Sequence, residues 1–150
     1  LGRYIKTDPE SLIKAEEAFR KAIALKADYA AAYYQLALTL EQANKIDKAI
    51  EELEKALQRF PTNATLKFDL GRLYFNSGKV DEAAKQFQEI VILIPNNSNA
   101  LFSLAVSYER LGRTRQALNN YRKVLDLNPD NQAIKDKVAQ LEQILQQQAP

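Results

Sequence analysis

The 150-residue sequence has the composition of a folded protein, since 46% of its residues are hydrophobic and 27% are charged. Its 21 basic and 19 acidic residues leave a net charge of +2, too small to indicate nucleic acid or an anionic membrane as the main partner. The chain has neither cysteine nor histidine, which excludes disulfides, thiolate chemistry and the commonest general base. Absence of cysteine fits the cytoplasm and the periplasm equally well, so the compartment stays open.

The N-terminal residues 9–26 predict an amphipathic helix. Asp8 and Pro9 form a typical helix start, because aspartate can cap a helix and proline fits its first turn. Before this pair, Leu1 and Gly2 resemble the remnant of another helix. The units that repeat from residue 30 onward consist of two helices each. We therefore expect residues 1–29 to be a partial first repeat and the natural protein to continue upstream.

From residue 30 onward the sequence repeats every 34 residues. Each unit contains two helical patterns of about 13 residues, the second with a small residue followed by a large apolar one four positions later. The prolines at the same period are Pro61, Pro95 and Pro129. A fixed period of this length is typical of a repeat array. We predict full repeats at 30–63, 64–97 and 98–131.

The turns carry two kinds of residue at the same period. One kind tolerates the left-handed backbone that ends a helix, and the other can cap the start of the next helix. The first kind is Asn44, Gly78 and Gly112, and the second is Asn63, Asn97 and Asn131. Both kinds favour an alternation of helix and short turn.

The longest aliphatic run is Ile90–Ile94. In isolation this run would predict a strand, because it is β-branched and uncharged. The phase of the repeat favours a helix, and Pro95 ends it. Five residues are far fewer than the roughly 20 needed to span a bilayer, so we expect no membrane insertion by this segment.

The C-terminal residues 132–147 predict a last helix with one apolar side. That side consists of Ile134, Val138, Leu141 and Leu145. We expect this helix to cap the array, with residues 148–150 as a polar tail. The whole chain, 1–150, is then a single domain.

These recurring positions resemble the tetratricopeptide repeat (TPR) family. The family signature is matched by Leu70-Gly71-x-x-Tyr74, Gly78, Ala83, Phe87 and Pro95, and by Leu104-Ala105-x-x-Tyr108, Gly112, Ala117, Tyr121 and Pro129. The resemblance implies an all-α, right-handed superhelical solenoid of antiparallel helix pairs. It also implies a concave groove lined by the first helix of each unit, and a function in protein–protein interaction.

The first helices place aromatic and apolar residues at equivalent positions of successive units. We predict that these residues hold a peptide or helix of a partner protein, with the arginines pairing with a partner carboxylate. The predicted partner-binding residues are Tyr34, Leu38, Phe68, Arg72, Phe75, Asn99, Phe102, Val106 and Arg110. Packing between helices is the alternative role for the aromatics, but a contiguous exposed apolar strip favours binding.

Other functions find less support in the sequence. No serine has an imidazole to activate it, zinc sites need histidine or cysteine, and the four glycines are scattered. We therefore predict no catalysis, no metal and no cofactor. Some family members grip a C-terminal carboxylate of chaperone tails with basic and amide side chains. The corresponding positions here are Tyr34, Leu38, Asp69, Asn99 and Ser103, which lack the positive clamp.

Two alternatives to groove binding remain. The first is self-assembly, in which a second copy covers an apolar edge of the partial first repeat. That edge consists of Leu12, Ile13, Ala15, Phe19 and Ile23. The second alternative is that this segment presents substrates as the arm of a larger enzyme or envelope complex.

Overall fold

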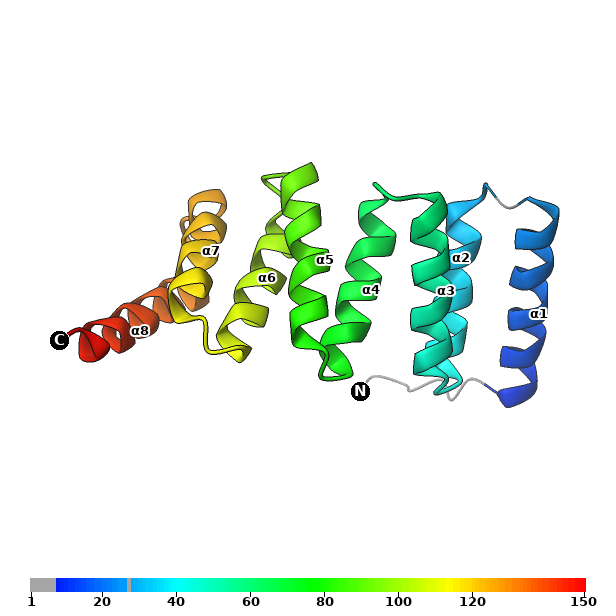
Figure 1. Cartoon of the computed structure of the whole chain (residues 1–150), viewed down its shortest axis with the longest axis horizontal. Helices are drawn as coiled ribbons and strands as arrows, with labels where there is room; N and C mark the ends of the chain where they lie inside the picture. The colour runs from blue at the N-terminus through cyan, green and yellow to red at the C-terminus, as the bar shows by residue number, and fades with distance from the viewer. Residues whose placement is uncertain (1–7, 27) are drawn as a thin grey trace. The chain divides into compact units, whose positions relative to one another are not determined.

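The computed structural model describes residues 8–26 and 28–150, and within them it contains eight α-helices and no strand (Figure 1). The helices are α1 (Pro9–Leu25), α2 (Ala30–Gln42), α3 (Ile46–Arg59), α4 (Ala64–Asn76), α5 (Val80–Leu93), α6 (Ser98–Arg110), α7 (Thr114–Leu127) and α8 (Gln132–Gln148). They form two compact units, Leu1–Leu70 and Gly71–Pro150, with α4 contributing to both. The helix remnant predicted at Leu1 and Gly2 lies outside the described residues.

In the first unit, α2 packs between α1 and α3. The predicted start of α1 is confirmed, because the Asp8 carboxylate accepts a hydrogen bond from the Ser11 backbone N–H at 3.2 Å and Pro9 occupies the first turn. Leu36 of α2 and Leu53 of α3 are fully buried. Helix α1 contains no buried residue, although it has the same repeat pattern as α3.

Charged side chains connect α1 to the helix pair that follows it. The Lys45 ammonium, at the start of α3, lies 2.9 Å from a Glu16 carboxylate oxygen, and Arg20 lies 3.0 Å from both Glu16 and Glu52. The hydrogen bond from Lys45, together with that from Arg20, lowers the pKa of Glu16 below its ordinary value. The network joins second helices of consecutive repeats within this unit.

The turn residues behave as predicted. Asn44, Gly78 and Gly112 adopt positive φ angles of 58°, 80° and 71°, so the left-handed backbone ends each first helix. The three asparagine caps are also confirmed, with side-chain oxygens accepting from backbone N–H groups at 3.0, 3.0 and 3.1 Å. The pairs are Asn63 with Leu66, Asn97 with Ala100 and Asn131 with Ile134.

In the second unit, α6 packs against α5 and α7, and α7 packs against α8. Gly71 of α4 lies against the Phe87 ring of α5. A Cβ atom at Gly71 would stand 2.7 Å from the ring atom Cε1, so the position needs a residue without a side chain. Further along the chain, Leu101, Ala117, Tyr121 and Ile134 belong to one buried apolar cluster.

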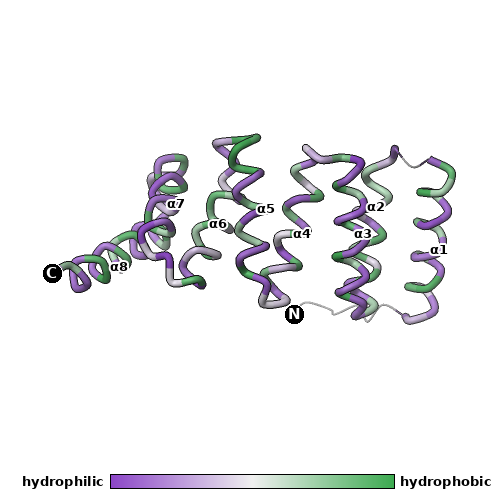
Figure 2. The backbone as a smooth tube through the Cα atoms, in the orientation of Figure 1, coloured by the Kyte–Doolittle hydropathy of each residue, from purple (hydrophilic) through white to green (hydrophobic). Residues whose placement is uncertain are grey.

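The aliphatic run Ile90–Ile94 forms the last turn of α5 and its C-cap, Ile94, rather than a strand. Ile90 is fully buried, whereas Ile92, Leu93 and Ile94 are exposed by 69, 44 and 45%. Figure 2 shows this hydrophobic stretch at the C-terminal end of α5. In the part of the chain that the structure describes, no helix combines the length and the hydrophobicity of a membrane span.

Candidate functional site

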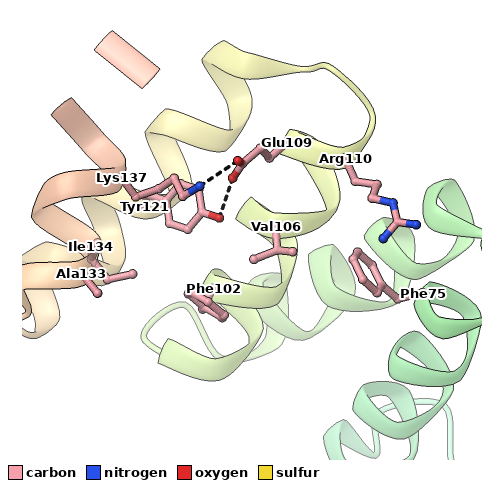
Figure 3. Close-up of a pocket in the computed structure, with 9 residues that line it drawn as sticks. All are labelled: Phe75, Phe102, Val106, Glu109, Arg110, Tyr121, Ala133, Ile134 and Lys137. Carbon is pink, nitrogen blue, oxygen red and sulfur yellow. Dashed lines mark hydrogen bonds and ion pairs between the residues drawn. The ribbon is translucent and has the colours of Figure 1, made fainter. Parts of the chain in front are cut away.

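A cavity of about 700 Å³ lies within the second unit, between α4, α6, α7 and the start of α8 (Figure 3). We call it the α6 pocket, because α6 supplies four of its nine lining residues. The lining consists of Phe75, Phe102, Val106, Glu109, Arg110, Tyr121, Ala133, Ile134 and Lys137. The size is that of a site for a small ligand or a few peptide side chains.

The floor of the α6 pocket is apolar. Phe102 and Val106 are one helical turn apart and point into it (Figure 3). Phe102 is 43% exposed, and its ring contacts Tyr121 edge to face at 6.0 Å between centroids. The contact holds Phe102 in place without covering it, which leaves an ordered aromatic surface.

A hydrogen-bonded carboxylate fixes the side of the pocket that borders α7 and α8. Glu109 accepts a hydrogen bond from the Tyr121 hydroxyl at 2.9 Å and from the Lys137 ammonium at 2.9 Å. Burial of the phenol and its bond to Glu109 raise the pKa of Tyr121, because both disfavour the phenolate. Glu109 therefore joins three helices at one point.

Helix α8 is positioned by its cap and by two ion pairs. Asn131 caps its first turn, which contains Ala133 and Ile134. Lys137 then pairs with Glu109, and Glu142 pairs with Arg122 of α7 at 2.6 Å. These contacts make α8 a wall of the pocket as well as the end of the array.

The opposite rim carries an arginine with an aromatic partner. The guanidinium carbon of Arg110 lies 5.4 Å from the centroid of the Phe75 ring, a cation–π distance. Arg110 is exposed, and no carboxylate among the described residues pairs with it. The guanidinium can thus accept an anionic group without losing an ion pair.

The structure brings four of the predicted partner-binding residues together: Phe75, Phe102, Val106 and Arg110 line the α6 pocket. Asn99 is exposed at the start of α6, and Arg72 is half-buried in α4, but neither lines this pocket. The other three, Tyr34, Leu38 and Phe68, are half-buried residues of the first unit.

Sequence reasoning did not assign Tyr121, Ala133, Ile134 or Lys137 to the site. A signal for two of them was present in the period. Asn99 and Ser103 occupy groove positions of the third full repeat, and one further period leads to Ala133 and Lys137. Extending the repeat onto the last helix would have found the α8 wall.

A second cavity of about 350 Å³ lies beside α5 and Tyr108. Arg113 and Asp81 form an ion pair in its lining at 2.9 Å, and the Tyr108 hydroxyl lies 3.4 Å from Gln88 Oε1. Asp81 and Arg113 thus neutralise each other in this lining. Among the described residues, no group of three or more histidine, cysteine, aspartate or glutamate side chains is arranged to hold a metal ion.

Consecutive helix pairs with a 34-residue period, together with an open apolar pocket, define a helical-repeat interaction protein. Three family models of the tetratricopeptide repeat match the chain, at residues 14–64, 40–105 and 98–131. The chain belongs to the tetratricopeptide repeat family, whose members are typically non-catalytic. No curated protein matches the sequence significantly.

Solved structures agree with this fold. MamA is 18% identical with a TM-score of 0.78, over 95% of this chain and 85% of that one. YrrB, described as a TPR protein with an unusual peptide-binding site, is 23% identical with a TM-score of 0.70, over 85 and 66%. The first TPR of Spaghetti (RPAP3), bound to the HSP90 peptide SRMEEVD, is 22% identical with a TM-score of 0.67, over 79 and 96%. These structures show the same all-α fold, and membership of the tetratricopeptide repeat family makes the chain a protein-interaction module.

Proposed function

We propose that the chain is an adaptor or scaffold that holds a peptide or helix of a partner protein in the α6 pocket. One observation carries the proposal: an ordered, 43% exposed Phe102 stands in an apolar cavity beside an arginine that has no carboxylate partner among the described residues. An exposed aromatic in a concave apolar site is typical of binding hot spots. Two similar structures, YrrB and Spaghetti (RPAP3), are described with peptides or a peptide-binding site.

The chemistry of this site differs from a clamp for a C-terminal carboxylate. Such a clamp needs several convergent cationic and amide groups. In the α6 pocket, Lys137 is already paired with Glu109, and Arg110 is the remaining cation. The positions that correspond to the clamp include Asp69 and Ser103, which carry no positive charge. We therefore do not propose that this chain binds the HSP90 peptide that Spaghetti (RPAP3) binds.

The proposal is tested by affinity capture from the native extract with a Phe102→Glu variant. Its matched control is Ile92→Glu, because Ile92 is also an exposed apolar residue of the second unit but lies at the end of α5 outside the pocket. Circular dichroism establishes that both variants are folded. We expect the wild type and the control to retain the same partner and Phe102→Glu to lose it. Equal capture by all three proteins would contradict the proposal.

The exposed face of α1 favours a second candidate, self-assembly. Ile13 is 55% exposed, and Leu12, Ala15, Phe19 and Ile23 are only half-buried. A second copy that covers this face would make the apparent mass depend on concentration. Sedimentation of the wild type and Ile13→Glu measures this dependence, and a concentration-independent monomer would exclude this candidate.

A further inference from the structure

We infer that the α6 pocket selects an extended peptide segment in which a carboxylate side chain follows or precedes an apolar side chain by three or four positions. The inference rests on the proposed function and adds the sequence pattern of the partner. It is carried by the spacing of Phe102, Val106 and Arg110 and by the charges of the lining.

The spacing on α6 sets the distance between the two recognised groups. Phe102, Val106 and Arg110 follow one another at intervals of four residues and line the same pocket. At 1.5 Å per residue, the ends of this row are about 12 Å apart along the helix. Side chains of a helix lean in the same direction, so the distance along the helix between the Phe102 ring and the Arg110 guanidinium stays close to this value. An extended peptide covers about 12 Å in three to four residues.

The length of this row favours an extended segment over a helical one. A helix would place its carboxylate about eight residues from its apolar anchor to match the same 12 Å. An extended strand brings both groups into the pocket with a shorter segment.

The charges of the lining determine the sign of the partner. Glu109 already accepts two hydrogen bonds, and one of them neutralises Lys137. Arg110, stacked on Phe75, is the lining charge that no described carboxylate balances. An Arg–carboxylate contact can be bidentate and is among the strongest charge-assisted hydrogen bonds. The apolar residue then lies over Phe102 and Val106, at the other end of the row.

The test uses peptides of glycine and serine with blocked ends that contain one leucine and one glutamate. The spacing between these two residues is two, four or eight positions. Each peptide is titrated into the ¹⁵N-labelled full chain, and amide chemical shifts report both the site and the affinity. We expect shifts around Phe102, Val106 and Arg110, with the four-position peptide binding about fivefold more tightly than the other two, as for one added partly exposed ion pair.

Charge reversal provides the matched control. In Arg110→Glu, the four-position peptide with lysine in place of glutamate should bind better than the glutamate peptide. Arg115→Glu makes the same charge change at an exposed residue outside the pocket and should keep the wild-type preference. Both residues are exposed, so the amide spectra should stay those of a folded chain.

The outcomes separate this inference from the proposed function. Binding at the pocket with equal affinity for all spacings, or with the eight-position peptide preferred, would overturn the extended pattern and leave the pocket as the binding site. A peptide whose only carboxylate is its free C-terminus, if bound more tightly, would overturn the side-chain carboxylate. If no peptide shifts the resonances of the pocket, both proposals fail.

Discussion

Helices α1 and α5 carry the same repeat positions but bury them differently. Phe87 of α5 is 2% exposed and Ala83 is fully buried, whereas the equivalent Phe19 and Ala15 of α1 are only half-buried. Helix α5 is preceded by a first helix whose Gly71 contacts the Phe87 ring, and no described helix precedes α1. In a repeat array, burial therefore depends on the neighbouring helix more than on the helix's own sequence.

The largest expected effect is the loss of stability when Phe87 is truncated, and it should exceed the loss at Phe19. Phe87→Ala should lower the free energy of unfolding by about 4 kcal/mol, because it opens a cavity in a packed core. Phe19→Ala should lower it by about 1–2 kcal/mol, because the side chain is partly solvated already. Urea unfolding followed by circular dichroism measures both. Equal losses would mean that α1 is as well packed as α5.

A second test probes the contact between Gly71 and the Phe87 ring, for which α1 has no described equivalent. Gly71→Ala should destabilise the chain by about 1–3 kcal/mol, because the new Cβ would stand 2.7 Å from the Phe87 ring. Helix propensity alone predicts the opposite sign, a gain of about 1 kcal/mol.

Phe87→Leu is the matched second change. One period earlier, the positions of Gly71 and Phe87 are occupied by Ala37 and Leu53, so the repeat combines alanine with leucine there. The loss caused by Gly71→Ala should become smaller in the Phe87→Leu background. An unchanged loss in the double-mutant cycle would show that the ring is not its cause.

A third prediction concerns alkaline pH. The raised pKa of Tyr121 means that the folded chain keeps a proton that the unfolded chain releases above the phenol's ordinary value of 10. The contribution of Tyr121 to stability should therefore be fully present below pH 10 and be lost as the pH rises above it. Tyr121→Phe should cost about 1 kcal/mol at neutral pH and reduce this alkaline loss.

Tyr108→Phe is the control for that change, because the Tyr108 hydroxyl contacts an amide oxygen rather than a carboxylate. We expect it to keep the wild-type alkaline slope in thermal unfolding between pH 8 and 11. The same slope in Tyr121→Phe would rule out Tyr121 as its source.

The smallest effect belongs to the charged contact between α1 and α3. Lys45→Met should cost less than about 1 kcal/mol, because the pair with Glu16 is partly exposed. The pKa of Glu16 is lowered, so its contribution is present above the ordinary value of 4.5 and disappears as the pH falls through the folded-state pKa. The difference between variant and wild type in urea unfolding should therefore vanish at pH 2–3 and shrink in 1 M salt, and a difference that persists there would exclude this ion pair as the cause.

Much of the fold could be predicted because local rules set it. Asn97 caps a helix and Gly112 ends one through interactions within a few residues, so the sequence alone is enough to recognise them. The phase of the repeat also gave the right answer for Ile90–Ile94, where β-propensity points to a strand.

The site could be predicted only in part, because its walls come from residues distant in sequence. Phe102, Val106 and Arg110 share one helix face, which periodicity identifies. Lys137 and Tyr121 reach the pocket through Glu109, from 28 and 12 residues away. The repeat period points to Lys137, but the meeting of Lys137 and Tyr121 at Glu109 depends on how α7 and α8 pack, which the period does not give. The half-buried state of Phe19, by contrast, follows from the repeat pattern, because an incomplete first repeat leaves this apolar edge uncovered.

The exposed end of α5 also affects how the chain behaves once it unfolds. Ile90–Ile94 is a short, uncharged segment of high β-propensity, the kind that pairs between molecules in cross-β aggregates. In the native chain its backbone N–H groups donate helical hydrogen bonds, and Pro95 follows at once as a residue that cannot donate to a β-ladder. Heating releases the segment from the helix but leaves the proline in place. The reversibility of thermal unfolding should therefore depend on this one helix end, although three of its residues, Ile92, Leu93 and Ile94, are exposed and add little to the stability of the folded state.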